Sequence, residues 1–312
     1  MSYERQLPLK LLGSVGYTFQ RGVHLLRTRD VNAPDPQTGL RPSPDAGPIL
    51  QFESTGVSVR NELRVTLRTN LNSRVTLFSN YILSSTHSDT DGAYTTPANS
   101  YDLADEYGRA SFDQRHRFFV GGSVTLPWQM RLSPYLFASS GRPFNITTGR
   151  DNNLDTLFTD RPAFASPTDP GSIITPFGVF NPNPLPGEPI IPRNFGEGHG
   201  QLTLNLSFSK TFGFGPSPKA QAGNGNRRQS RGGGGGRGMG GGRGGAGVFG
   251  GSDDSWVGSN HRYNLTFTVN AQNVINHTNL AGINGILTSP LFGLPNQALA
   301  PRRVDLVMRF NF

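Results

Sequence analysis

One segment near the middle of the chain, "GRDNNLDTLFTDRP" from Gly149 to Pro162, is rich in oxygen-bearing side chains. These are Asp151, Asn152, Asn153, Asp155 and Asp160. Carboxylate and amide oxygens are ligands for Ca²⁺, but the segment lacks the central Gly and the distal Glu of an EF-hand loop. The same residue types also build ordinary turns. We favour a surface loop, and calcium binding stays open as the alternative.

Other chemistry-bearing residues show no recognisable spacing. The six histidines are scattered and form no HExxH pattern: His24, His87, His116, His199, His261 and His277. There is no GxSxG nucleophile motif, no GxxxxGK phosphate loop and no cysteine. The absence of cysteine excludes disulfides, thiolate zinc sites and cysteine nucleophiles. We therefore expect no metal, no cofactor and no enzymatic activity.

A Gly/Arg-rich insertion at 219–251 contains "RRQSRGGGGGRGMGGGRGG". Six cationic residues there supply most of the net charge of +8, and the segment has no Asp or Glu: Lys219, Arg227, Arg228, Arg231, Arg237 and Arg243. Arg-Gly-Gly repeats occur in proteins that track nucleic-acid backbones. Its single aromatic residue, Phe249, leaves little for bases to stack on, so we expect a solvated loop. A soluble nucleic-acid binder would show salt-sensitive binding that is lost on deleting 223–251.

Alternation of apolar and polar residues is the dominant pattern of the remaining chain. The tail "RRVDLVMRFNF" places Val304, Leu306, Met308, Phe310 and Phe312 at every second position. Such alternation predicts a strand with one apolar and one polar face. It recurs, with varying clarity, to give about eight strands: 8–20, 56–69, 74–83, 115–127, 130–140, 201–212, 262–271 and 302–312. The run 130–140 is the most ambiguous because it contains Pro134.

The predicted strands are about 10–13 residues long, which suits tilted strands that cross a bilayer. Their connections alternate between short turns, near 72 and 128, and long loops at 21–54, 86–113, 142–199 and 272–301. This habit is typical of outer-membrane barrels, with short periplasmic turns and long outer loops. The connection 213–260 is the exception, because it is long but falls on the short-turn side. There is also no apolar run of about 18 residues for a transmembrane helix.

Four blocks of sequence resemble a known family in their order along the chain. They are "GYTFQRGVHLLRTRDVNAP" (16–34), "DGAYTTPANSYDLADEYGRASFDQRHRFFVGGSVTLP" (91–127), "SGRPFNITTGRDNNLDTLFTDRPAF" (140–164) and "VNAQNVINHTNLAGINGILTSPLFGLPNQALAPRRVDLVMRFNF" (269–312). The chain thereby resembles the C-terminal barrel portion of Oar-like TonB-dependent receptors. These acidobacterial outer-membrane proteins carry a carboxypeptidase-regulatory-like N-terminal module.

The resemblance implies a 22-stranded barrel around a plug domain, with TonB powering the uptake of ligand. We expect this chain to supply about the last third of such a barrel, with no plug domain and no signal peptide, since "MSYERQLPLK" lacks the features of one. Contact with TonB would require the missing N-terminal parts, and the chain alone is not expected to transport. The resemblance also implies that the barrel-assembly machinery reads the terminal aromatic residue.

The prediction is thus a partial antiparallel transmembrane β-barrel over 1–312, in the outer membrane of a Gram-negative bacterium. The five apolar tail residues would face lipid. The polar set would face the lumen: Arg60, Glu62, Arg64, Arg68, Arg262, Asn264, Asp305 and Arg309. The transported ligand is not identified. The alternative is a self-contained eight-stranded adhesin or structural barrel, closed by pairing Leu9–Phe19 with Val304–Phe312.

Overall fold

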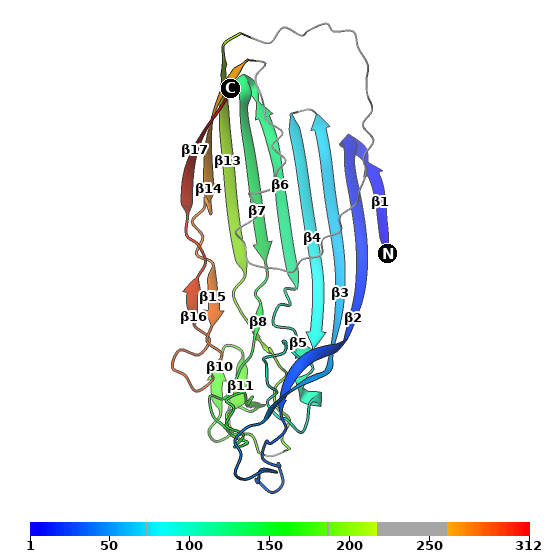
Figure 1. Cartoon of the computed structure of the whole chain (residues 1–312), viewed down its shortest axis with the longest axis vertical. Helices are drawn as coiled ribbons and strands as arrows, with labels where there is room; N and C mark the ends of the chain where they lie inside the picture. Colours follow the sequence, from blue (N-terminus) through cyan, green and yellow to red (C-terminus); the bar gives the residue numbers. More distant parts are fainter. Residues whose placement is uncertain (73, 186, 217–260) are drawn as a thin grey trace.

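The computed structural model describes residues 1–72, 74–185, 187–216 and 261–312. Their main feature is one large antiparallel sheet with the strand order β1-β2-β3-β4-β6-β7-β13-β14-β17 (Figure 1). The bounds are β1 Ser2–Leu7, β2 Leu11–Asp30, β3 Leu50–Asn72, β4 Val75–Ser88, β6 His116–Leu126, β7 Met130–Ser139, β13 Gln201–Phe214, β14 Tyr263–Gln272 and β17 Arg303–Asn311. All eight predicted strands are present, and the predicted all-β, antiparallel fold is confirmed. Across these described ranges, no helix has the length and apolar character needed to cross a membrane.

The register aligns the alternating residues of neighbouring strands into rows. Leu306 pairs with Val269, which pairs with Phe208, which in turn pairs with Leu132. Because successive residues of a strand point to opposite sides, the apolar sets fall on one side of the sheet. We call this side the apolar face. The other side, which carries the interleaved polar residues, is the polar face.

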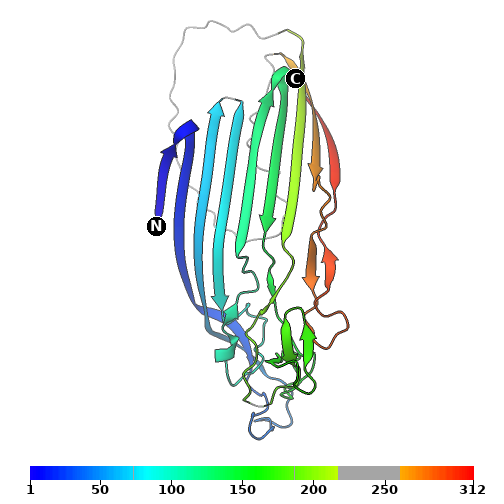
Figure 2. The same cartoon turned by 180° about the vertical axis from the view of Figure 1, so that it is seen from behind.

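The two ends of the sheet differ in their connections. One end, the turn end, holds the connection between Asn72 and Val75, the short 3₁₀ turn η3 (Pro127–Gln129) and the C-terminus (Figures 1 and 2). The other, the loop end, holds the long connections. β13 and β14 pair antiparallel from Phe214 to Tyr263, so their connection also starts and returns at the turn end. This agrees with the prediction that the connection 213–260 falls on the short-turn side. The predicted insertion at 219–251 lies outside the described residues.

The first long loop is shorter than predicted. β2 continues past an irregularity around Gly22–Leu25 and pairs Leu26–Asp30 with 50–54 of β3. The loop expected over 21–54 therefore spans only 31–49. Backbone pairing beyond the bulge overrides the weaker alternation there, because the ladder hydrogen bonds do not depend on side-chain type.

The first strand of the sheet, β1, was not predicted. It pairs Ser2–Leu7 with Leu11–Gly16 through the short turn η1 (Pro8–Lys10). The strand predicted over 8–20 begins instead at Leu11, since Pro8 has no N–H to donate and starts the turn. The alternative pairing of Leu9–Phe19 with Val304–Phe312 is not formed. β2 pairs with β1 and β3, and β17 pairs with β14 within the described residues.

The connections at the loop end fold together into what we call the loop module, residues 31–49, 89–115, 140–200 and 273–302. It contains three small sheets: β12 (Gly196–Glu197) with β8 (Pro143–Phe144), β11 (Gly178–Asn181) with β9 (Ala163–Phe164) and β10 (Ile173–Thr175), and β15 (Leu280–Ile283) with β16 (Pro295–Ala298). β5 (Gly108–Arg109) extends the large sheet by pairing with β4. The core of the module buries Ile146, Phe180, Ile191 and Leu287. The predicted long loops are thus a packed unit.

Candidate functional site

The C-terminal strand β17 presents its apolar residues on the apolar face, and they are exposed. Leu306 and Phe312 keep 79% and 92% of their surface accessible, and Val304, Met308 and Phe310 are also exposed. Such a continuous exposed apolar surface indicates contact with another apolar phase. The sheet register continues this surface through the facing residues of β14 and β13.

Aromatic rings gather on the apolar face near the turn end. Phe310 stacks against Phe214 and Tyr263, with ring centroids 6.0 and 6.2 Å apart, and Phe312 lies 6.1 Å from Phe310. Girdles of aromatic residues mark the level of the lipid headgroups in outer-membrane barrels. The terminal aromatic residue is therefore part of a larger aromatic cluster.

The predicted lumen-facing residues share the polar face but do not form a single cluster. Arg60, Glu62, Arg64 and Arg68 alternate along β3, Asn264 lies on β14, and Asp305 and Arg309 lie on β17. Arg262 lies just before β14, with its guanidinium 5.5 Å from the Tyr263 ring centroid. The structure brings together the first three of the β3 residues and leaves the β14 and β17 residues at the other edge of the sheet. That they face a lumen stays a prediction.

Glu62 is the centre of the densest charge cluster on the polar face. Its carboxylate accepts hydrogen bonds from Arg60 and from Arg64, the latter at 2.7 Å. Arg117 of β6 reaches across β4 to the same carboxylate at 3.4 Å. Three guanidinium groups thus share one buried carboxylate, and this part of the polar face is electropositive. Arg117 is not among the predicted lumen-facing residues, although it is interleaved with the apolar set of its own strand.

The acidic segment predicted as a turn or a calcium loop lies in the loop module. Both Asp151 oxygens accept backbone N–H groups, from Asp155 and Thr156, and an Asp160 oxygen accepts the N–H of Asn152 at 2.9 Å. Asp155 accepts from the Leu157 N–H and from the Asn153 amide. The carboxylates are thus occupied in holding turns. In the described part of the chain, no three His, Asp or Glu side chains are grouped to hold a metal ion.

Burial changes the protonation of this segment. Removal from water raises the pKa of the Asp160 carboxyl to about 6, and the charges of Asp155 and Asp151 act in the same direction. Burial also raises the pKa of Asp155, against the hydrogen bonds that favour its charged form. Burial and the neighbouring carboxylates therefore disfavour the charged forms of Asp155 and Asp160.

Buried polar contacts connect the segments of the loop module to one another and to strands β2 and β4 of the large sheet. Arg161 meets Glu106 at 2.9 Å and Arg27 meets Asp89 at 2.6 Å, with all four side chains largely buried. Arg193 donates to the Ser88 carbonyl at 2.6 Å. The partners are 55 to 105 residues apart in sequence, so no local spacing could have identified them.

Comparison with known proteins identifies the family to which this chain belongs. A family model described as an outer membrane beta barrel domain matches residues 1–222. The comparison with curated proteins finds no match. Among solved structures, the chain is similar to the outer membrane transporter YddB from Escherichia coli, with 9% sequence identity and a TM-score of 0.46. The match covers 99% of this chain but 31% of the transporter, and a TM-score at this level does not by itself establish a shared fold.

Proposed function

Because the chain belongs to the family of outer membrane beta barrel domains, we propose that it forms one sector of the wall of a larger ligand-uptake barrel in the outer membrane. The larger barrel would be a TonB-dependent transporter or receptor of the Oar-like type. The proposed role of this chain is binding and passage of ligand, without catalysis.

The direction of the two edge strands carries this proposal. Nine strands follow one another along the main path of the described sheet, and each pairs antiparallel with the next. With an odd number of alternating strands, β1 and β17 run in the same direction (Figure 1). Joining these edges would require a parallel pair, whereas bacterial outer-membrane barrels are antiparallel throughout and have even strand numbers.

The edges nevertheless need partners. An unpaired strand edge in hydrocarbon leaves N–H and C=O groups without hydrogen bonds, at a cost of several kcal/mol for each group. Only Leu11–Gly16 of the 20-residue β2 pair with β1, and β17 has β14 on one side only within the described residues. Additional strands of a larger barrel would satisfy both edges.

The two faces fit the same proposal. The apolar face would contact lipid, and the polar face with the Glu62 cluster would line the hydrated lumen, where charged groups remain solvated. In this orientation the turn end is periplasmic and the loop module is extracellular, where it would meet the ligand. A plug domain and a TonB-contacting motif would lie outside these 312 residues. The barrel-assembly machinery would bind β17.

Gel mobility after refolding of the chain alone in detergent tests the proposal. Closed barrels migrate as compact species that shift on heating. We expect no heat-modifiable band from the 312 residues alone, and we expect one from the assembled barrel, by which we mean the complete barrel that contains this chain. A compact heat-modifiable band from the chain alone would support the self-contained small barrel instead. Coding DNA upstream of Met1 that reads into a plug domain would support the larger barrel.

A further inference from the structure

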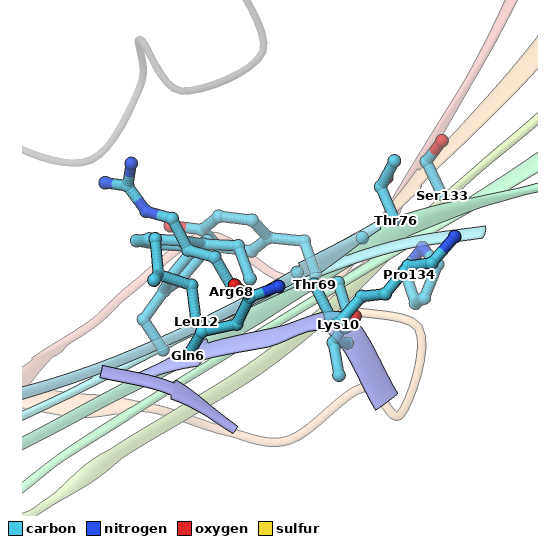
Figure 3. Close-up of a pocket in the computed structure, with 14 residues that line it drawn as sticks. Gln6, Lys10, Leu12, Arg68, Thr69, Thr76, Ser133 and Pro134 are labelled. Carbon is cyan, nitrogen blue, oxygen red and sulfur yellow. The ribbon is translucent and has the colours of Figure 1, made fainter. Parts of the chain in front are cut away.

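A hollow lies on the polar face near the turn end, between β1 and β7. It has a volume of about 840 Å³, which is within the range of small-molecule sites. Its lining residues come from six strands and the η1 turn, and Figure 3 shows them with Arg68, Leu12 and Gln6 toward one end and Thr76 and Ser133 toward the other. No sequence motif pointed to it.

One row of residues that pair across neighbouring strands lines the hollow. Across the sheet, Arg68 pairs with Phe78, Phe78 with Gly121, and Gly121 with Tyr135. The missing side chain at Gly121 leaves space between the two aromatic residues. Phe119 turns its ring over that space, because a Cβ at Gly121 would lie 3.1 Å from the ring's Cζ. A bulkier residue at this position would displace the ring.

The three aromatic rings form one surface in which neighbouring rings are tilted by 52° and 58°, and we call this surface the aromatic plate. The ring centroids of Phe78 and Phe119 are 5.3 Å apart, and those of Phe119 and Tyr135 are 4.5 Å apart. These separations are in the range of favourable aromatic contacts. An apolar or aromatic ligand body would therefore bury its surface against this plate.

The charge of the lining has one sign. Lys10 and Arg68 line the hollow, and no Asp or Glu is among the residues that do so. The Arg68 guanidinium lies 5.1 Å from the centre of the Phe78 ring, so a cation is held directly beside the aromatic plate. Hydroxyl groups of Thr76 and Ser133 add hydrogen-bonding capacity.

We propose that this hollow binds a small molecule that carries a carboxylate or phosphate group on an aromatic or apolar body. Arg68, which lies beside the aromatic plate, would bind the anionic group, and the plate of Phe78, Phe119 and Tyr135 would bind the body. Lys10, whose side chain points to the other end of the hollow in Figure 3, would add to the positive potential. This inference rests on the proposed function, because it places the ligand on the lumenal wall. A cationic ligand would be repelled, and a neutral one would make no use of the two cations.

Phenyl phosphate is a suitable probe because it combines both features and dissolves in water. Saturation-transfer NMR on the purified assembled barrel should show that it binds more tightly than inorganic phosphate, which lacks the ring, and than phenol, which lacks the charge. Arg68→Gln should weaken binding by about tenfold or more, the effect expected for losing a charge-assisted hydrogen bond. Arg68→Lys, which keeps the charge, should retain most of the affinity.

Arg309→Gln is the matched control, since it removes the same charge from the same face at the far edge of the sheet. It should leave phenyl phosphate binding unchanged. Lys10→Gln, in a turn, provides a second variant if Arg68→Gln does not assemble. Absence of binding by the intact barrel, equal binding of phenol, or equal affinity of the Arg68→Gln and Lys10→Gln variants and the unaltered barrel would overturn the inference. None of these outcomes depends on whether the 312 residues alone form a closed barrel. The gel-mobility experiment therefore tests the proposed function separately.

Discussion

Arg161 and Glu106 form a buried ion pair in the loop module, with an Nη2–Oε1 distance of 2.9 Å and side chains only 1% and 5% exposed. The same Glu106 oxygen accepts the backbone N–H of Ala98 at 3.0 Å, and Arg161 also donates to the Asp105 carbonyl at 3.1 Å. The pair therefore ties the turn around η2 (Ala104–Glu106) to the segment that leads into β9.

Replacing Glu106 by Gln should open the loop module locally. The change leaves the Arg161 charge buried without its counter-ion, which costs about 3 to 5 kcal/mol. Hydrogen exchange of module amides in the assembled barrel measures the loss. Glu197→Gln is the control, because Glu197 is 55% exposed and lies 3.5 Å from Arg109, where an ion pair contributes about 1 kcal/mol at most. Equal effects of the two variants would contradict the assigned role of the buried pair.

The stability of the loop module should decrease as the pH rises between about 4 and 6. Asp160 has a pKa of about 6 in the folded chain and an ordinary value of 3.8. Across this window the folded state holds a proton that the unfolded state has lost. The extra stability is thus fully present below the ordinary pKa of 3.8 and is lost as the pH rises through the folded-state pKa of about 6.

Amide exchange corrected for its intrinsic pH dependence can follow this loss. Asp160→Asn should flatten the profile, since an amide oxygen can still accept the Asn152 N–H but does not titrate. The same substitution at the exposed loop residue Asp169 should keep the profile of the unaltered protein. A rising or unchanged profile across this pH window would show that burial of Asp160 is not the controlling factor.

Phe180 should be a major contributor to the core of the loop module. Its side chain is fully buried and lies against Phe164 and Phe195, with ring centroids 6.1 and 6.0 Å apart. Phe180→Ala should lower the stability of the loop module by about 3 to 5 kcal/mol. This loss should be measurable as faster proteolysis of the loop module in intact cells. Phe164→Ala should cost less, because the Phe164 side chain is 53% exposed. A larger effect at Phe164 would show that the core is packed differently.

Arginine substitutions at two neighbouring positions of β17 should differ sharply. Leu306 lies on the apolar face, and Leu306→Arg should destabilise the assembled barrel by about 2 to 4 kcal/mol if it lies near the bilayer midplane. Val307 lies on the polar face opposite Thr268, and Val307→Arg should be tolerated. The yield of heat-modifiable barrel in the outer membrane compares them. A similar loss for both would argue against the assigned faces.

The strands of this chain were predictable because their pattern is local. Alternation over ten residues identified β17, and the interleaved Arg60, Glu62 and Arg64 could be assigned to one face from sequence alone. β1 was missed because "SYERQL" shows little apolar alternation, and the long extensions of β2 and β3 follow from backbone pairing. The pairing of Leu9–Phe19 with Val304–Phe312 is not formed, because β1 occupies the part of that edge from Leu11 to Gly16 and Leu9 lies in the η1 turn.

The loop module and the hollow were not predictable from the sequence. Their contacts join residues far apart, such as Arg193 and Ser88, and side-chain type alone does not specify such partners. Arg117 joins Glu62 only because β4 brings β3 and β6 into register. Gly121 has functional meaning only beside Phe78 and Tyr135, which the register supplies.

We expect the apolar face of this sheet to contact lipid and its polar face to line an aqueous lumen. The chain has no cysteine, so single spin labels can be placed along β17 of the assembled barrel, from Arg303 to Phe310. Their accessibility to oxygen and to a water-soluble nickel complex should alternate. Labels at 304, 306, 308 and 310 should respond mainly to oxygen, and those at 303, 305, 307 and 309 to nickel. Uniform accessibility, or the opposite phase, would contradict the account.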